Sequence, residues 1–131
     1  MTVSPTTLSA GSTGNTLAFT YTAATGGLWS GEVEVTVPTG WPNAPSTSPS
    51  SAGYVTSTCG TLLSLSGRTM VTVGVTLAAA KTCTITYGSK AGGGPGAGAP
   101  SAVTAYLFRA SEASTPGTPK ALATSPTVTT S

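Results

Sequence analysis

Apolar and polar residues alternate along much of this chain, and a period of two is the pattern of a β-strand with one buried face. The clearest case is the segment 31–37, where valines alternate with Glu32, Glu34 and Thr36. The same alternation predicts strands at 2–8, 15–23, 69–75, 81–87, 103–110 and 121–129, with two short strands on either side of Cys59-Gly60. Turn residues recur between these segments, so about eight strands are expected.

The alternation also predicts which side chains point into the core. In the segment 15–23 they are Leu17, Phe19 and Tyr21. In the segment 69–75 we expect Val71, Val73 and Val75 to point inward, with Met70, Thr72 and Gly74 on the outer side. In the segment 81–87 the inward set is Cys83, Ile85 and Tyr87, which leaves an outer row of Thr82, Thr84 and Thr86.

Two segments break the alternation. The Pro- and Ser-rich stretch 38–51 is expected to be a long surface loop, because its prolines remove the N–H donors that a strand needs. The Gly-rich stretch 91–100 has too few side chains to fix its own path and is expected to be a flexible excursion between strands. No amphipathic helix is visible. The pattern therefore predicts one all-β domain over 1–131, an antiparallel Ig-like or Greek-key β-sandwich.

Composition narrows the range of functions. Charged residues make up 6% of the chain, the formal net charge is +2, and the sequence contains no His, Asp or Gln. The five Lys and Arg residues are scattered, whereas nucleic-acid binding needs a basic stripe, so no nucleic-acid partner is expected. No apolar stretch approaches the ~20 residues of a membrane span, so no membrane insertion is expected. With so few acid–base groups, we expect no enzyme, no catalytic residue and no cofactor.

Cys59 and Cys83 are the only sulfur nucleophiles, and they allow three interpretations. A disulfide between strands is the simplest, and it would place maturation outside the reducing cytosol. A reactive thiol lacks a histidine as partner base. A zinc site is weaker still, because zinc takes four nitrogen or sulfur ligands and no metal site is expected from two cysteines.

Two other groups of residues are candidate sites. Glu32 and Glu34 project from one face of one strand, where paired carboxylates either hydrolyse glycosides or simply form a solvated face that discourages edge pairing. Trp29, Trp41 and Tyr54 lie beside Gly, Pro and Ser, so they are the aromatics expected to be exposed. Such side chains contact a glycan or a protein partner, or cover the open end of a sandwich.

Four stretches carry a resemblance to a known class of module. They are VSPTTLSAGS (3–12), LAFTYT (17–22), VPTGW (37–41) and VTLAAAKTCTITYG (75–88). Together they resemble Ig-like repeat modules of large exported bacterial surface proteins, and the last stretch resembles the penultimate strands of those modules. The resemblance implies an extracellular spacer, adhesive or filament-forming module with no catalytic residues to carry over.

The expected function is therefore that of a non-enzymatic structural or adhesive module of an extracellular or cell-surface protein or filament. Its expected partners are other proteins or further copies of itself, with a glycan as another candidate. A virion structural protein, such as a capsid decoration or tail protein, is the alternative, because Met1–Pro5 has no features of a secretory signal. A carbohydrate-binding module that uses the three aromatics is the third hypothesis.

Overall fold

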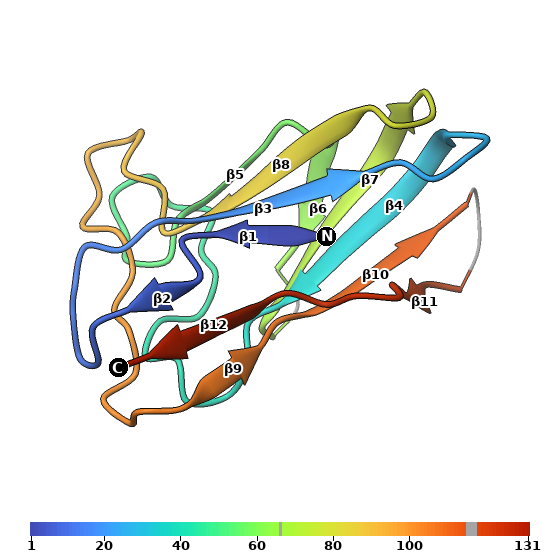
Figure 1. The fold of residues 1–131 in the computed structure, drawn as a ribbon. Coiled ribbons are helices and arrows are strands. Elements are labelled where there is room, and N and C mark those ends of the chain that lie inside the picture. Colours follow the sequence, from blue (N-terminus) through green and yellow to red (C-terminus); the bar gives the residue numbers. More distant parts are fainter. Residues whose placement is uncertain (66, 115–117) are drawn as a thin grey trace.

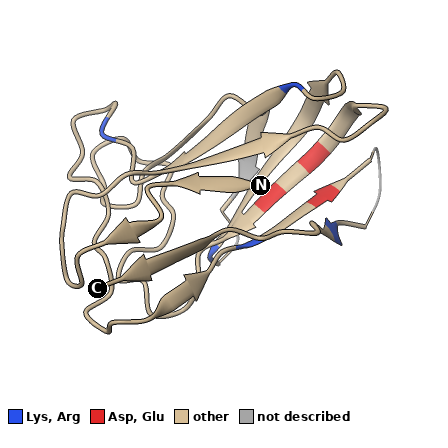
Figure 2. Cartoon of the chain, viewed as in Figure 1, with Lys and Arg blue, Asp and Glu red and all other residues tan. Residues whose placement is uncertain are grey.

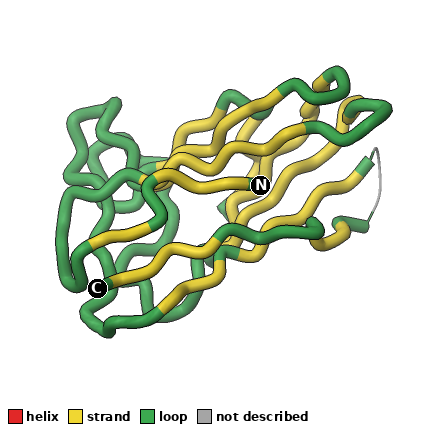
Figure 3. The backbone as a smooth tube through the Cα atoms, in the orientation of Figure 1, coloured by secondary structure: helices red, strands yellow, loops and turns green. Residues whose placement is uncertain are grey.

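The computed structural model describes residues 1–65, 67–114 and 118–131. These residues form an all-β structure without a helix, which confirms the predicted fold class (Figure 1, Figure 3). The strands are β1 (Thr2–Ser4), β2 (Thr7–Leu8), β3 (Leu17–Thr22), β4 (Leu28–Thr36), β5 (Val55–Ser57), β6 (Thr61–Ser64), β7 (Thr69–Leu77), β8 (Thr82–Tyr87), β9 (Ala105–Leu107), β10 (Arg109–Ala113), β11 (Lys120–Ala121) and β12 (Thr127–Thr130). They are more numerous and mostly shorter than predicted.

The strands form three sheets. The first has the order β1-β3-β8-β5, the second β11-β10-β4-β7-β6 and the third β2-β12-β9. All neighbours are antiparallel except β2 and β12, which are parallel. Figure 1 shows the first two sheets as two layers, with the small third sheet at the end where the chain terminates. Buried side chains of both larger sheets, such as Phe19, Val35 and Ile85, join in one core cluster.

Three predicted strands divide between sheets. The segment 103–110 divides at Phe108, whose side chain is fully buried and whose N–H donates to the carbonyl oxygen of Pro126. β9, before Phe108, belongs to the third sheet, and β10, after it, belongs to the second. The segment 2–8 divides in the same way into β1 and β2, and the segment 121–129 divides into β11 and β12. Alternation predicts extended chain in all three cases, but it does not reveal a change of sheet.

The predicted inward faces of β3 and β8 are confirmed, whereas that of β7 is partly wrong. Met70 and Thr72 are fully buried although an outer position was predicted for both. Val73, predicted to point inward, is only half-buried. Val71 is buried, with 8% of its surface exposed, but it lies opposite Glu34 in the register with β4 and is not part of the core cluster, so it belongs to the outer face.

A β-bulge explains the error. The register between β4 and β7 shifts between Gly31 and Glu32, whose partners are Val75 and Val73, so that β7 has one extra residue there. That residue is Gly74, with a φ of 66°, a backbone conformation that glycine adopts at little cost. One extra residue reverses the faces of the side chains on one side of the bulge relative to those on the other. Val75, after the bulge, points inward as predicted, whereas Thr72 and Met70, before it, turn inward against the prediction.

The two predicted loops pack closely against each other. The stretch 38–51 contains no strand, as predicted, although Ser46 forms an isolated bridge with Tyr54. The Gly-rich stretch 91–100, expected to be a flexible excursion, instead follows a defined path with Ala97, Ala99 and Pro100 buried. Backbone hydrogen bonds hold it: Ala97 exchanges two with Asn15, and Gly96 accepts one from Gly53. Glycine allows this close approach, because a Cβ at Gly94 would lie 2.6 Å from the carbonyl oxygen of Pro49.

Candidate functional site

Cys59 and Cys83 form a disulfide bond, as predicted, with their Cα atoms 5.0 Å apart. Cys83 is an inward residue of β8, and Cys59 follows β5, where its N–H donates to the hydroxyl of Ser57 at 2.9 Å. Both cysteines are buried. The bond therefore fixes the connection between β5 and β6, which lie in different sheets, to the centre of the first sheet.

Trp41 is buried, which corrects the expectation that it is exposed. Only 1% of its surface is accessible. Its ring packs edge-on against Tyr87, Tyr106 and Phe108, with ring centroids 5.2 to 6.1 Å apart. The aromatic core can reach it because the loop 38–51 folds back over the end of the sandwich, where the guanidinium of Arg68 donates a hydrogen bond to the Trp41 carbonyl oxygen. The side chain therefore has a packing role and is not available to a glycan.

The other two aromatics of the predicted group lie apart from Trp41. Trp29 is 61% exposed, and its Nε1 donates to the carbonyl oxygen of Gly26 at 3.0 Å. It lies near the start of β4, whereas Trp41 follows the end of the same strand. Tyr54 is half-buried, and its carbonyl oxygen accepts a hydrogen bond from the N–H of Ser89. Because Trp29 lies at the start of β4 and Trp41 lies beyond its other end, the three rings do not form one stacking platform.

Glu32 and Glu34 share the outer face of β4, as predicted, and both are half-buried. Burial raises the pKa of Glu34, and the neighbouring charge of Glu32 raises it further. Their register partners on the neighbouring strand β7 are Val73 and Val71, whose side chains supply no polar group for acid–base chemistry. The arrangement gives a locally acidic strip on the sheet rather than two carboxylates facing each other across a cleft.

The third acid, Glu112, makes a contact between the sheets that the sequence analysis missed. It lies opposite the buried Val33 in the register of β10 with β4, so it is on the inner face. Its carboxylate accepts a hydrogen bond from the hydroxyl of Tyr21, which is buried on β3 of the facing sheet. Burial of Tyr21 raises the pKa of its phenol, and the hydrogen bond and the charge of Glu112 raise it further. The only sequence signal was the alternation of 109–113, which puts Glu112 on the side of Ala110.

The outer side chains of the first sheet form a surface without charged residues. Cross-strand register aligns Thr2 with Thr20 and Thr84, Ser4 with Ala18, Thr86 and Thr56, and Thr22 with Thr82. We call these side chains the threonine face. The sequence predicted the row on β8, and the register extends that row across all four strands. Such a face offers hydroxyl and methyl groups with little charge to desolvate.

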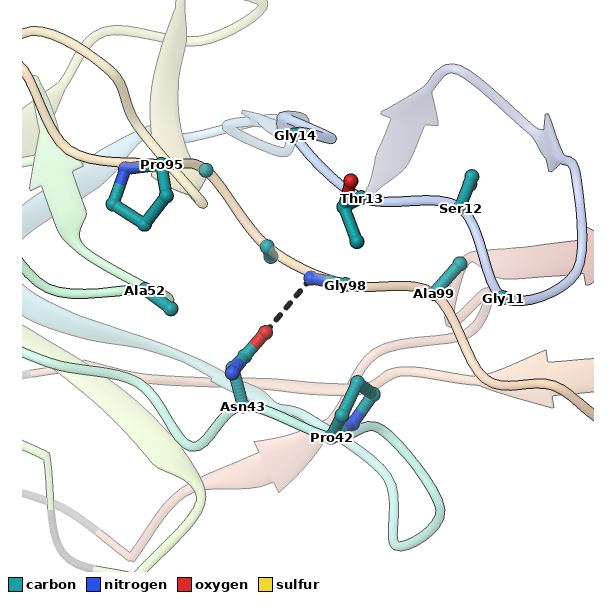
Figure 4. Close-up of a pocket in the computed structure, with 12 residues that line it drawn as sticks. Gly11, Ser12, Thr13, Gly14, Pro42, Asn43, Ala52, Pro95, Gly98 and Ala99 are labelled. Carbon is teal, nitrogen blue, oxygen red and sulfur yellow. Dashed lines mark hydrogen bonds between the residues drawn. The ribbon is translucent and has the colours of Figure 1, made fainter.

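Three loops enclose a surface pocket of about 330 Å³ at the end of the molecule where the Gly-rich stretch lies (Figure 4). Residues 11–14 form one wall, Pro42 and Asn43 another, and 95–99 the third. The Asn43 side chain reaches the opposite wall of the pocket, where its Oδ1 accepts a hydrogen bond of 2.7 Å from the N–H of Gly98. The lining consists of backbone, proline rings, small side chains and hydroxyls. No charged side chain is among the lining residues, although the Nζ of Lys90 would lie 3.3 Å from a Cβ at Gly14, which lines the pocket.

The described residues contain no group of three or more His, Cys, Asp or Glu that could hold a metal ion. Within the same ranges no helix has the length and apolar character to cross a membrane. Comparison of the chain with protein-family models, curated proteins and solved structures finds no match.

Proposed function

We propose that this chain is a non-enzymatic structural module of an exported surface protein or filament, which packs against neighbouring modules. The observation that carries the proposal is the threonine face. Its side chains span all four strands of one sheet, and none is charged. Interface cores are depleted of charged residues, because a charge that loses water must find a partner. A neighbour can cover this face without such a cost.

Rigidity supports the same role. The Cys59–Cys83 disulfide, the aromatic packing around Trp41 and the backbone hydrogen bonds of 91–100 hold the core and the loop end together. Disulfides form and persist in oxidising compartments, which fits an extracellular or cell-surface location. Trp29, Trp41 and Tyr54 do not support a glycan-stacking surface, because Trp41 is buried and the three rings do not form one surface.

A charge placed on the threonine face tests the proposal. Thr20→Lys puts an ammonium group at the centre of the face, and Thr47→Lys puts the same charge on an exposed position of the loop 38–51. Association of the oxidised chain is measured by light scattering over a concentration series. We expect the wild type and Thr47→Lys to associate and Thr20→Lys to remain monomeric. A wild type that is monomeric throughout, or equal association of all three proteins, would contradict the proposal.

A further inference from the structure

Arg68 and Arg109 line one surface pocket of about 270 Å³, although they are 41 positions apart in the numbering (109 − 68). Arg109 begins β10, and Arg68 precedes β7. Figure 2 shows Lys and Arg at separate places on the molecule, except for two blue segments that lie close together near the start of β10. The five cations that looked scattered in the sequence therefore include one spatial pair. We call this site the arginine pocket.

Backbone contacts fix the place of both arginines on the chain's fold. Arg109 is paired with Thr36 in the register of β10 with β4. Arg68 is half-buried; its carbonyl oxygen accepts the N–H of Val37 at 2.9 Å, and its guanidinium donates one hydrogen bond to the Trp41 carbonyl oxygen. A guanidinium has five N–H donors, so most of those on Arg68 remain for a ligand. The backbone of both residues and the guanidinium of Arg68 are therefore held in place before a ligand binds.

The two positive charges have no acidic partner in the pocket. The residues that line it include no Asp or Glu, and the nearest acid on the facing strand, Glu34, is paired with Ser111 rather than with Arg109. Within the described ranges the side chain of Arg109 has no hydrogen bond or ion pair. Two like charges that share one concave surface raise the local positive potential and attract an anion.

The rest of the pocket favours an anion attached to a larger body. Leu107 is 43% exposed, and with Pro38 it provides an apolar wall beside the arginines. Thr39 is exposed at the rim and offers a hydroxyl. A small inorganic anion would use only the guanidinium groups. A sugar acid would also place its C–H groups on Leu107 and Pro38 and its hydroxyls near Thr39.

We propose that the arginine pocket binds the carboxylate of an acidic saccharide. Arg109 binds the carboxylate through parallel N–H donors, which match the two carboxylate oxygens, and Arg68 provides the second positive charge. The site differs in place and chemistry from the stacking surface expected from Trp29, Trp41 and Tyr54. It also goes beyond the proposed packing role, because it needs only one folded copy of the chain.

Calorimetry with defined probes tests the site. The probes are trigalacturonic acid, the neutral sugar galactotriose, triglutamate peptide and sodium sulfate. We expect trigalacturonic acid to bind and galactotriose not to bind. Arg109→Ala should weaken binding by about tenfold or more, which is the loss expected for charge-assisted hydrogen bonds. Lys120→Ala removes one exposed charge elsewhere and should leave binding unchanged. Added salt should weaken binding, because the site is exposed.

Further variants separate binding from folding. Arg109→Lys keeps the charge but loses the paired donors, so its affinity should lie between those of the wild type and Arg109→Ala. Amide resonances of Thr39 and Leu107 should shift when trigalacturonic acid is added, whereas those of Thr84 on the threonine face should not. Equal binding by Arg109→Ala and the wild type would overturn the proposal. Sulfate or triglutamate that binds as tightly as trigalacturonic acid would overturn the assignment to a saccharide. Neither result bears on whether Thr20→Lys blocks association.

Discussion

Trp41 connects the loop 38–51 to the aromatic core, and it provides a direct comparison with Trp29. Trp41→Ala removes a fully packed ring and should lower the free energy of unfolding by about 3–5 kcal/mol, the usual cost of truncating a buried large aromatic. Trp29→Ala truncates a side chain that is 61% exposed and should cost far less. Urea unfolding of both variants and the wild type measures the difference. Similar losses in the two variants would contradict the burial of Trp41.

Ionisation of two buried tyrosines should weaken the fold at alkaline pH. Burial raises the pKa of Tyr21 above its ordinary 10.0, with further contributions from Glu112, and burial raises that of Tyr87 to about 12 although the charge of Arg68 opposes it. A group whose pKa is raised by folding stabilises the protein below its unfolded pKa. That contribution declines as the pH rises through the folded pKa. The free energy of unfolding should therefore decrease above about pH 10.

Tyr21→Phe isolates one of these two groups. The variant lacks the phenol that must stay neutral beside Glu112, so its free energy of unfolding should decrease less between pH 9 and pH 12 than that of the wild type. At pH 7 the variant should be less stable, because Glu112 loses a hydrogen-bond donor. Guanidinium unfolding at a series of pH values measures both effects. Identical pH dependence in the two proteins would show that Tyr21 ionises as freely in the folded state as in the unfolded state.

The bulge of β7 makes Gly74 the position that sets the faces of this strand. Nothing lies within 4 Å of a Cβ built at Gly74, so a substitution there meets only the strain of φ 66°. Gly74→Ala should cost about 1–2 kcal/mol, the penalty of a left-handed conformation for a residue with a Cβ. Gly74→Asn should cost less, because asparagine adopts this conformation more readily. Chemical denaturation of the two variants ranks them. An alanine variant as stable as the wild type would mean that the bulge is not strained.

The sequence predicted strands well where alternation is uninterrupted. The inward residues of β3 and β8 are those that a period of two selects, because each strand runs through a single sheet without a bulge. In β7 the period of two is interrupted at Gly74. The alternating valines predicted a regular strand, although an isolated glycine within a strand often marks a bulge. A period-two pattern therefore identifies a strand more reliably than it identifies which face is buried.

Candidate sites were predictable only where they depend on few residues. The disulfide needs two cysteines, and both were visible in the sequence. The burial of Trp41 depends on Phe108, Tyr87 and Tyr106, which come from distant segments. The arginine pocket likewise depends on the pairing of β10 with β4, which brings Arg109 beside the turn that carries Arg68. Local patterns do not contain these long-range pairings, so the charges appeared scattered.

The whole molecule is held by contacts between distant parts of the chain. Ala10 near the start donates to the carbonyl oxygen of Ser131, and Gly11 donates to that of Pro100. The third sheet pairs β2 in the first tenth of the chain with β12 at its end. The loop end of the molecule therefore depends on both terminal segments and on the Gly-rich stretch. Loss of order in one of these segments should propagate to the others.

The Cys59–Cys83 bond is the covalent part of this organisation. It spans a sequence separation of 24 residues. In the chain-entropy treatment, closing a loop of this length lowers the entropy of the unfolded chain, which raises the free energy of unfolding by about 3–4 kcal/mol. Cys59→Ala/Cys83→Ala should therefore be less stable than the oxidised wild type by about that amount, since the unfolded chain regains its freedom while each alanine fills less of the buried site.

Reduction of the wild type provides the control for that variant. If loop closure is the main effect, the reduced wild type and the double-alanine variant should both lose most of the free energy that the disulfide contributes. The variant should lose slightly more, because it also lacks the buried sulfur atoms. Urea unfolding with and without reductant, followed by the fluorescence of the two tryptophans, of which Trp41 is buried, measures both losses. A reduced protein as stable as the oxidised one would mean that the noncovalent core alone restricts the chain, and that an oxidising compartment is not needed for the fold.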